Sequence, residues 1–192
     1  MTPGNKFSLR PFNENDYEGF AALQNLLYPD HPKSLETLRH DDKTREKKIP
    51  HKNWVWERNK KILVSAIHTQ FTESIHPQKF VIEIYVHPEF QGQGFGAACY
   101  KHLLHELKQF EPVKLTCIVY ETHERGIRFF QERGFVQTMK EKESSLDLTG
   151  YDPEQYQDEI DRVLAQNLRI MTLTEFRQEN ADADYKVWEL ER

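Results

Sequence analysis

Three glycines at alternate positions, Gly92, Gly94 and Gly96, separate a strand-like segment from a helix-like one. Residues 80–86 are almost all β-branched or aromatic, as in a β-strand. The His-Pro pair that follows ends this segment, because proline cannot donate to a strand ladder. Apolar residues recur every three or four positions across residues 100–110, which predicts a helix with one buried face. The chain therefore contains a strand, a glycine-rich turn and a helix in direct succession.

The turn at residues 91–97 favours an anionic ligand. The first N–H groups of a helix lack internal partners and carry the positive end of the helix dipole. Glycines let a phosphate approach the backbone, because no Cβ is in the way. The turn has no Lys-Ser/Thr pair after its glycines, so it is not a nucleoside-triphosphate P-loop. A phosphate-binding turn is therefore the prediction, and a glycine turn without a ligand is the alternative.

Two phosphate-binding patterns overlap in this turn. The first is G-x-G-x-x-G/A, through Gly92, Gly94 and Ala97, which is the fingerprint of dinucleotide-binding proteins. A nicotinamide or flavin enzyme would place Glu121, at the end of a later strand, near the ribose. However, the fingerprint comes after three or four other strands, and too little strand-helix alternation follows for a doubly wound sheet. The dinucleotide-dependent oxidoreductase is therefore the weaker hypothesis.

The second pattern, Q/R-x-x-G-x-G/A, runs through Gln91, Gly94 and Gly96 after a strand that ends in Val-His-Pro. This pattern resembles the coenzyme A loop of the GNAT N-acetyltransferases. The expected order of elements, β-α-α-β-β-β-α-β-α-β-β up to about residue 150, is also similar to that family. The resemblance implies an α/β (α+β) acyl-CoA N-acyltransferase fold, with a mixed central sheet splayed at its middle and helices on both faces.

The elements behind this order come from periodicity and from turn signals. We expect strands at residues 7–11, 53–59, 61–69, 80–86, 113–120, 136–142 and 145–148. We expect helices at residues 16–28, 34–46, 98–110 and 122–133. The helix at 34–46 is polar, so it either walls a substrate cleft or is simply solvated. Residues 72–79 are expected to form a polar loop.

The chain divides into a predicted GNAT domain at residues 1–150 and an extension at residues 151–192. A helix at 152–166, a strand at 168–173 and a helical segment at 174–192 make the extension a helix-strand-helix unit. Its sequence faintly repeats the start of the chain, so it is either a partial second GNAT-like repeat or a docking or dimerisation segment. Its apolar residues need a partner surface, which makes a homodimer possible.

The family resemblance implies acetyl-CoA as co-substrate and assigns residues to it. Backbone N–H groups of the turn would hold the diphosphate, and freed backbone of the preceding strand would pair with the pantetheine arm. The cofactor-binding residues implied are Ile84, Tyr85, Val86, Gln91, Gly92, Gln93, Gly94, Phe95, Gly96, Ala97, His123 and Phe130.

The resemblance also implies catalytic roles. Glu83, a carboxylate inside an apolar strand, is the candidate general base, and its pKa should rise if it is desolvated. The alternative is a salt-bridged or solvated carboxylate without a catalytic role. Many family members protonate the leaving thiolate with a tyrosine, but Phe130 stands at that position here, and His123 stands where an asparagine is common. Tyr120 or His123 would then supply the proton, directly or through water, or solvent alone would protonate the thiolate. The alternative is a non-catalytic acyl-CoA-binding or regulatory module.

Composition excludes several other classes. A net charge of −5 argues against a general nucleic-acid binder, and no apolar run is long enough for a membrane helix. The first ten residues lack an apolar signal core. Cys99 and Cys117 are expected to be free thiols, which fits a cytoplasmic protein. His102, His105 and Glu106 do not match a zinc motif, so no metal is predicted. The acceptor is expected to be a small-molecule amine or a protein or peptide amine.

Overall fold

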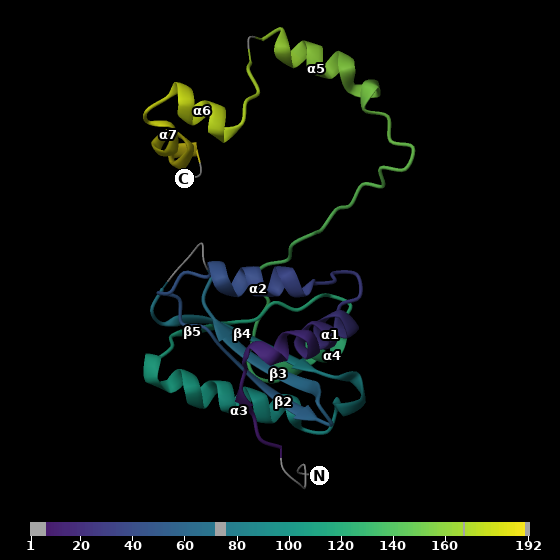
Figure 1. Cartoon of the computed structure of the whole chain (residues 1–192), viewed down its shortest axis with the longest axis vertical. Coiled ribbons are helices and arrows are strands. Elements are labelled where there is room, and N and C mark those ends of the chain that lie inside the picture. Colours follow the sequence, from purple (N-terminus) through teal and green to yellow (C-terminus); the bar gives the residue numbers. More distant parts are fainter. Residues whose placement is uncertain (1–6, 72–75, 167, 191–192) are drawn as a thin grey trace. The chain divides into compact units, whose positions relative to one another are not determined.

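The computed structural model describes residues 7–71, 76–166 and 168–190 (Figure 1). The chain forms two compact units, which meet in the sequence between Gln137 and Thr138. Four stretches lie outside the described residues: 1–6, 72–75 of the predicted polar loop, 167, and 191–192 of the predicted terminal helix. The domain boundary near residue 150 stays a prediction.

A five-stranded mixed sheet organises the first unit. Its strands are β1 (Arg10–Pro11), β2 (Lys52–Arg58), β3 (Lys61–Thr69), β4 (Lys79–Val86) and β5 (Lys114–Thr116). They lie in sequence order across the sheet, with antiparallel pairs from β1 to β4 and a parallel pair between β4 and β5. Asn59 and Lys60 join β2 to β3 with φ of 53° and 61°, as a two-residue hairpin turn requires. The predicted mixed sheet is confirmed, and it is not doubly wound.

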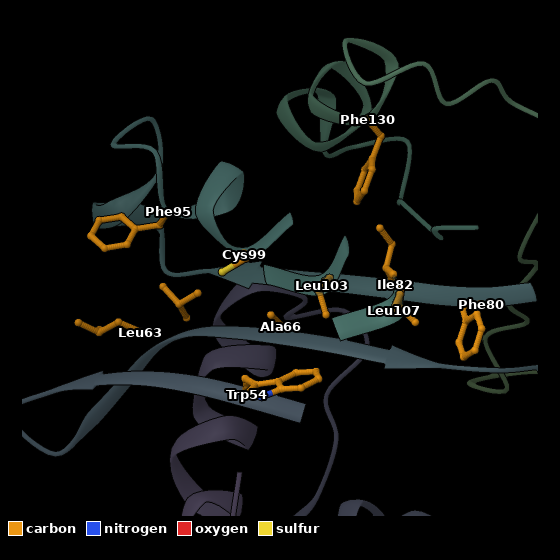
Figure 2. Packing of buried hydrophobic residues seen from close by; sticks show 11 residues of the cluster. Trp54, Leu63, Ala66, Phe80, Ile82, Phe95, Cys99, Leu103, Leu107 and Phe130 are labelled. Atoms are coloured by element: carbon orange, nitrogen blue, oxygen red, sulfur yellow. The ribbon is translucent and has the colours of Figure 1, made fainter. Parts of the chain in front are cut away.

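Helices cover both faces of this sheet. They are η1 (Glu14–Asp16), α1 (Tyr17–Leu27), α2 (Leu35–Thr44), η2 (Pro88–Phe90), α3 (Phe95–Leu107), η3 (Lys108–Phe110) and α4 (Glu124–Gln131). The α3 face of the sheet, which is the face that α3 covers, holds one apolar cluster. In it, Phe95, Cys99, Leu103 and Leu107 project every four residues toward the sheet (Figure 2). A second cluster, around Phe20 and Leu23, lies under α1 and α2. The sheet is therefore buried on two sides, as its nearly continuous apolar strands require.

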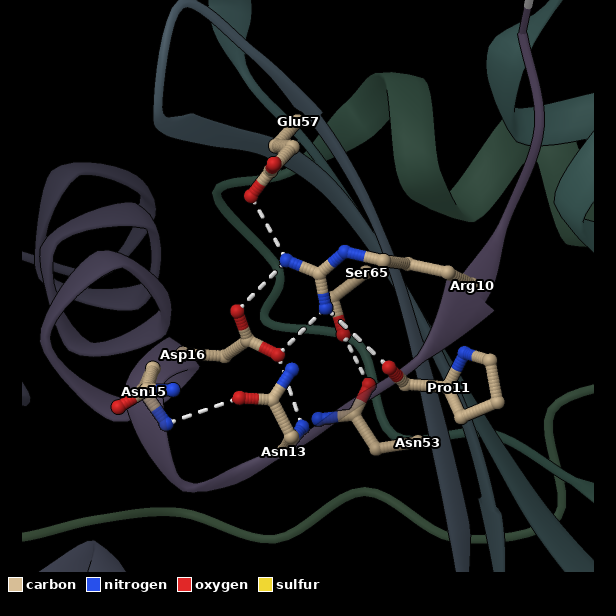
Figure 3. Close-up of polar contacts among 8 residues, drawn as sticks. All are labelled: Arg10, Pro11, Asn13, Asn15, Asp16, Asn53, Glu57 and Ser65. Atoms are coloured by element: carbon tan, nitrogen blue, oxygen red, sulfur yellow. Dashed lines mark hydrogen bonds and ion pairs between the residues drawn. The ribbon is translucent and has the colours of Figure 1, made fainter.

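A partly buried ion pair fixes the start of α1 against the sheet (Figure 3). Both guanidinium nitrogens of Arg10 donate to the Asp16 carboxylate, at 2.7 and 2.8 Å, and one also donates to Glu57 at 2.7 Å. Asp16 is 5% exposed and also accepts from the backbone N–H of Asn13, which closes a capping box. The hydrogen bonds from Arg10 hold the pKa of Asp16 below its usual range. This network sets where the rest of α1 crosses the sheet.

His68 is a titratable side chain in the apolar α3 face. It is 1% exposed, its ring lies 5.4 Å from Trp54 and 5.8 Å from Phe80, and neither ring nitrogen has a partner among the described residues. Burial is the main cause that lowers its pKa to about 4, and the nearby His51, Lys52 and His102 act in the same direction while Glu106 opposes them. His68 is therefore neutral in the folded protein down to mildly acidic pH.

We predict that this histidine makes the fold acid-sensitive. Below its ordinary pKa of 6.5 the unfolded chain binds a proton that the folded chain excludes until about pH 4, so stability falls as pH falls through this window. The loss from His68 alone should reach about 2 kcal/mol at pH ~5. Urea unfolding of the wild type and of His68→Leu, each at neutral pH and at this acidic pH, measures the loss of stability. His51 also has a pKa lowered to about 4 by burial, so His51→Gln should reduce the same loss. His40→Gln, an exposed change on α2, is the control. An identical pH dependence in wild type and His68→Leu would contradict the prediction.

Several predicted strands are shorter than expected or absent. The segment expected as a strand at 7–11 pairs only at Arg10–Pro11, and the one at 113–120 pairs only at Lys114–Thr116. Residues 136–142 and 145–148 form no strand, so the prediction of a final strand pair is wrong. Val136 is 79% exposed and Leu146 is 64% exposed, and no neighbouring strand in the described part of the chain takes their backbone hydrogen bonds. A strand needs such a neighbour, whatever its residue pattern.

The second unit is helical in its described residues. It contains η4 (Pro153–Tyr156), α5 (Gln157–Leu164), α6 (Leu173–Glu179) and α7 (Ala183–Leu190). The strand predicted at 168–173 is wrong, because Ile170 is 82% exposed and a capping box at Thr172 begins α6 there. Its role as a partial repeat or a dimerisation segment stays a prediction. In neither unit do the described helices include one that is both long enough and apolar enough to span a bilayer.

Candidate functional site

The sheet opens between β4 and β5. These strands pair only from Lys79 to Val81, opposite Lys114 to Thr116. From Ile82 to Val86, β4 has no partner on that side among the described residues, because the chain after Thr116 diverges from it. A cleft of about 830 Å³ occupies the opening and is lined by β4, by residues 118–120 and by α4. This opening confirms the predicted splay.

The glycine turn forms one end of this cleft. Gly92 and Gly94 have φ of 75° and 91°, the left-handed region that favours glycine. A Cβ on Gly92 would lie 3.1 Å from an Arg125 guanidinium nitrogen, whereas a Cβ on Gly94 would meet nothing within 4 Å. The Gln91 side chain donates to the carbonyl of Val86 at 3.0 Å and thereby ties the turn to the end of β4. Open space therefore lies in front of the N-terminus of α3.

Most of the predicted cofactor-binding residues line the cleft. They are Ile84, Tyr85, Val86, Gln91, Gly92, Gly94, Gly96, Ala97, His123 and Phe130. Gln93 and Phe95 do not line it, because Gln93 donates to the carbonyl of Glu89 at 2.7 Å and the Phe95 ring is buried in the α3 cluster. Only their backbone groups could contribute to the turn.

Glu83 lies on the same cleft wall, near the middle of β4. The Tyr85 hydroxyl, two residues along the strand and on the same face, donates to its carboxylate. Burial and the charge of Glu83 raise the pKa of Tyr85 well above its usual value, so this hydroxyl stays protonated. Glu83 is therefore a positioned carboxylate with a fixed hydrogen-bond donor, at a point that a ligand in the cleft can reach.

Tyr120 and His123 form part of the facing wall. The Tyr120 ring stacks on His31 at 4.7 Å, and the His123 ring lies 4.8 Å from Tyr28. His123 Nε2 lies 3.1 Å from the carbonyl oxygen of Leu27. His123, one residue after the predicted start of this helix, is the N-cap of α4, and its side chain makes no capping bond. The two candidate proton donors thus belong to an aromatic group that joins α1 to α4.

Phe130 has no hydroxyl to offer, and its ring is 9% exposed. It packs at 5.0 Å from Phe135 and belongs to the apolar α3 cluster, as Figure 2 shows. The part of Phe130 that reaches the cleft is therefore an apolar surface, not a proton donor.

Sequence reasoning missed two groups of cleft residues. The first comes from the end of α1 and the loop after it: Gln24, Leu27, Tyr28, His31 and Lys33. The second comes from α4 and the residues just after it: Arg125, Arg128 and Arg133. Two signals in the sequence could have identified these residues. One is a glutamine inside the apolar stripe of α1, and the other is the presence of three arginines in a stretch of nine residues of the helix predicted at 122–133. In the described residues, no three His, Cys, Asp or Glu side chains are placed to hold a metal.

A second cavity, of about 490 Å³, lies between α1, α2 and the sheet. It shares Gln24, Lys33 and Glu83 with the first cleft. Residues of α2 line it, which agrees with the interpretation that the helix at 34–46 walls a cleft. Glu83 is therefore accessible from two directions.

Comparison with known families gives one match: the sequence model of the "Acetyltransferase (GNAT) family" aligns with residues 20–135. This range contains β2 to β5, the glycine turn and both walls of the first cleft. A search of curated proteins found no match.

Solved structures of similar fold include several acetyltransferases. An acetyltransferase from Trypanosoma brucei is 25% identical, with a TM-score of 0.51, over 73% of this chain and 99% of that chain. The ribosomal-protein-S18-alanine N-acetyltransferase from Escherichia coli is 20% identical, with a TM-score of 0.54, over 69% of this chain and 79% of that one. An N-acetyltransferase from Staphylococcus aureus is 17% identical, with a TM-score of 0.55, over 70% and 86%. These likenesses confirm the predicted acyl-CoA N-acyltransferase fold.

Proposed function

The chain belongs to the GNAT acetyltransferase family, and we propose that it transfers the acetyl group of acetyl-CoA directly to a primary amine in a ternary complex. Members of this family use acetyl-CoA as co-substrate and act on amine acceptors. The observation that best supports the proposal is the cleft between β4 and β5, which has the glycine turn at one end and Glu83 on its wall. An anion-binding turn and a general base thereby share one ligand-sized space.

The residues around the turn fit coenzyme A. Gly92 and Gly94 leave the backbone open to a diphosphate, and Gly96 and Ala97, in the first turn of α3, line the same cleft. Arg125 adds a positive charge beside Gly92. The unpaired edge of β4 from Ile82 to Val86 offers backbone groups to the pantetheine arm. When bound, the coenzyme supplies an acetyl thioester, whose carbonyl the same edge can polarise.

Glu83 would act as the general base. An aliphatic amine arrives as an ammonium with a pKa of about 10.4, so one proton must leave before nitrogen can attack. Glu83 accepts that proton, and the free amine then forms the new C–N bond as the C–S bond breaks. The hydrogen bond from Tyr85 holds the carboxylate in place for this transfer. Tyr120 or His123, on the facing wall, gives a proton to the leaving sulfur, and the second proton that nitrogen loses as it becomes an amide replaces it through solvent. The two free thiols, Cys99 and Cys117, support a reducing, cytoplasmic location.

We predict that acetyl-CoA stabilises the protein and that amines release its thiol. At a concentration ~100-fold above Kd, binding adds about 2.7 kcal/mol to the free energy of unfolding, which a melting curve detects. Thiol release is then followed with a panel of primary amines. Stabilisation without thiol release for any amine would favour the acyl-CoA-binding module, a role that the apolar Phe130 would fit. Stabilisation by NADH and not by acetyl-CoA would overturn the proposal.

A further inference from the structure

The second cavity reaches across the sheet from Glu83 toward α2. Glu83 on β4 is paired in register with Ile67 on β3, and Ile67 with Asn53 on β2. All three line the cavity. Adjacent strands lie about 4.8 Å apart, so the cavity floor spans roughly 10 Å from Glu83 to β2. This length accommodates a linear small molecule with a polar group at each end.

Three buried polar atoms on the wall of this cavity have no hydrogen-bond partner in the described residues: Gln24 Oε1, His51 Nδ1 and Thr69 Oγ1. Gln24 is 8% exposed, and its carboxamide lies beside the Tyr85 hydroxyl that holds Glu83. A buried polar group without a partner costs about 1–3 kcal/mol. Water can satisfy such groups in the free protein, and a ligand with hydrogen-bond donors can take its place.

The charge around the cavity favours a cation. Four carboxylates line it, Asp41, Asp42, Glu46 and Glu83, against two cationic side chains, Lys33 and Arg45. Arg45 is already bonded to Asp42 at 2.7 Å, and the Tyr17 hydroxyl donates to the same carboxylate at 2.7 Å. His51 adds no charge near neutral pH, because burial lowers its pKa to about 4. Lys48 lies 2.8 Å from Glu46, so ion pairs offset Asp42 and Glu46. Asp41 and Glu83 against Lys33 still give the cavity a net negative charge, beside its unused hydrogen-bond acceptors.

We propose that this cavity binds the acetyl acceptor and that the acceptor is a linear diamine or polyamine, an inference that rests on the proposed acetyl transfer. One ammonium lies between Glu83 and Gln24 Oε1, where Glu83 takes its proton and the nitrogen is acetylated. The second ammonium lies on the α2 side, near Asp41 and Asp42. Gln24 thus positions the reacting nitrogen, and α2 selects acceptors that carry a second positive charge.

Three acceptors with four carbons each test this with the full chain and saturating acetyl-CoA. Putrescine ends in an ammonium, butylamine in a methyl group and γ-aminobutyrate in a carboxylate. We expect kcat/KM for putrescine to exceed that for butylamine at least ~10-fold, the equivalent of about 1.4 kcal/mol. The carboxylate of γ-aminobutyrate meets carboxylates on α2, so this acceptor should be the poorest of the three.

Two variants identify the two ends of the cavity. Asp41→Asn should lower kcat/KM for putrescine several-fold and so reduce the preference for putrescine over butylamine, because only the second ammonium loses a charged partner. Gln24→Met should raise KM for both amines without changing KM for acetyl-CoA. Glu36→Gln, a change at an exposed position of α2 outside the cavity, is the matched control and should not alter kcat/KM for either amine. Melting curves exclude a loss of folding as the cause.

The outcomes separate this inference from the proposed function. If amines are acetylated but kcat/KM for butylamine equals that for putrescine, the cavity does not select a second charge. The inference is then wrong, whereas the proposed acetyltransferase function is not affected. A lysine-containing peptide that is acetylated in preference to putrescine also overturns it. If acetyl-CoA neither stabilises the protein nor is consumed, both proposals are wrong.

Discussion

Replacement of Glu83 with glutamine is expected to lower kcat by about 10²–10⁴-fold near neutral pH, the usual contribution of a positioned general base. Glutamine keeps the size of the side chain and can still accept the hydrogen bond from Tyr85, but it cannot take a proton from an ammonium. The affinity for acetyl-CoA should not change, because the glycine turn is at the other end of the cleft. Steady-state thiol release and coenzyme titration measure the two quantities separately.

The pH dependence of this variant distinguishes a base from a structural carboxylate. As pH approaches the amine pKa of about 10.4, the acceptor loses its proton to solvent, so the deficit of Glu83→Gln should shrink. A purely structural role would give the same deficit at every pH. Glu18→Gln makes the same carboxylate-to-amide change at an exposed position of α1 and is the matched control. Wild-type kcat in Glu83→Gln at neutral pH would remove Glu83 from the mechanism.

The sequence was sufficient to predict the strand, turn and helix that organise the first unit. These elements depend on local chemistry: a β-branched strand, glycines at positions with positive φ, and one apolar helix stripe. The hairpin between β2 and β3 was predictable for the same reason. The splay of β4 from β5 came from the family resemblance, since no local pattern marks where two strands stop pairing.

Predictions failed where the structure depends on a neighbour. Strands were expected at residues 136–142 and 145–148, but a strand persists only where another strand takes its hydrogen bonds, and the described residues offer none there. In the same way, Ile170 and its neighbours have strand-like composition, but the capping box of Thr172 and Glu175 turns the chain into α6. Composition alone cannot reveal whether a partner strand is present.

The acceptor side of the site was missed for a different reason. Gln24 lies four residues after Phe20 and three before Leu27, within the buried stripe of α1. A polar residue at such a position is informative, because burial of an amide must be compensated. Its function becomes visible only when the Arg10–Asp16 ion pair fixes α1 over β4 and brings Gln24 to the wall that both cavities share.

Replacement of Gly94 with alanine is expected to weaken acetyl-CoA binding by about 10–100-fold. Gly94 has φ of 91°, and a Cβ there meets no protein atom within 4 Å, so the methyl group would project into the space that the diphosphate should occupy. Hydrogen bonds from backbone N–H to a charged group contribute about 1.5–3 kcal/mol each, and displacement of one accounts for this loss. Titration of the coenzyme with the purified variant measures it.

The backbone strain of this substitution must be separated from its effect on the ligand. Gly134 offers a matched control, because its φ is 84° and a Cβ there also meets nothing within 4 Å, yet it does not line the cleft. Both alanine variants should lose about 1–2 kcal/mol of stability from the left-handed backbone, whereas only Gly94→Ala should lose affinity for acetyl-CoA. Equal coenzyme affinity in the two variants would mean that the turn does not bind phosphate, since the strain is the same and only the exposure to the cleft differs.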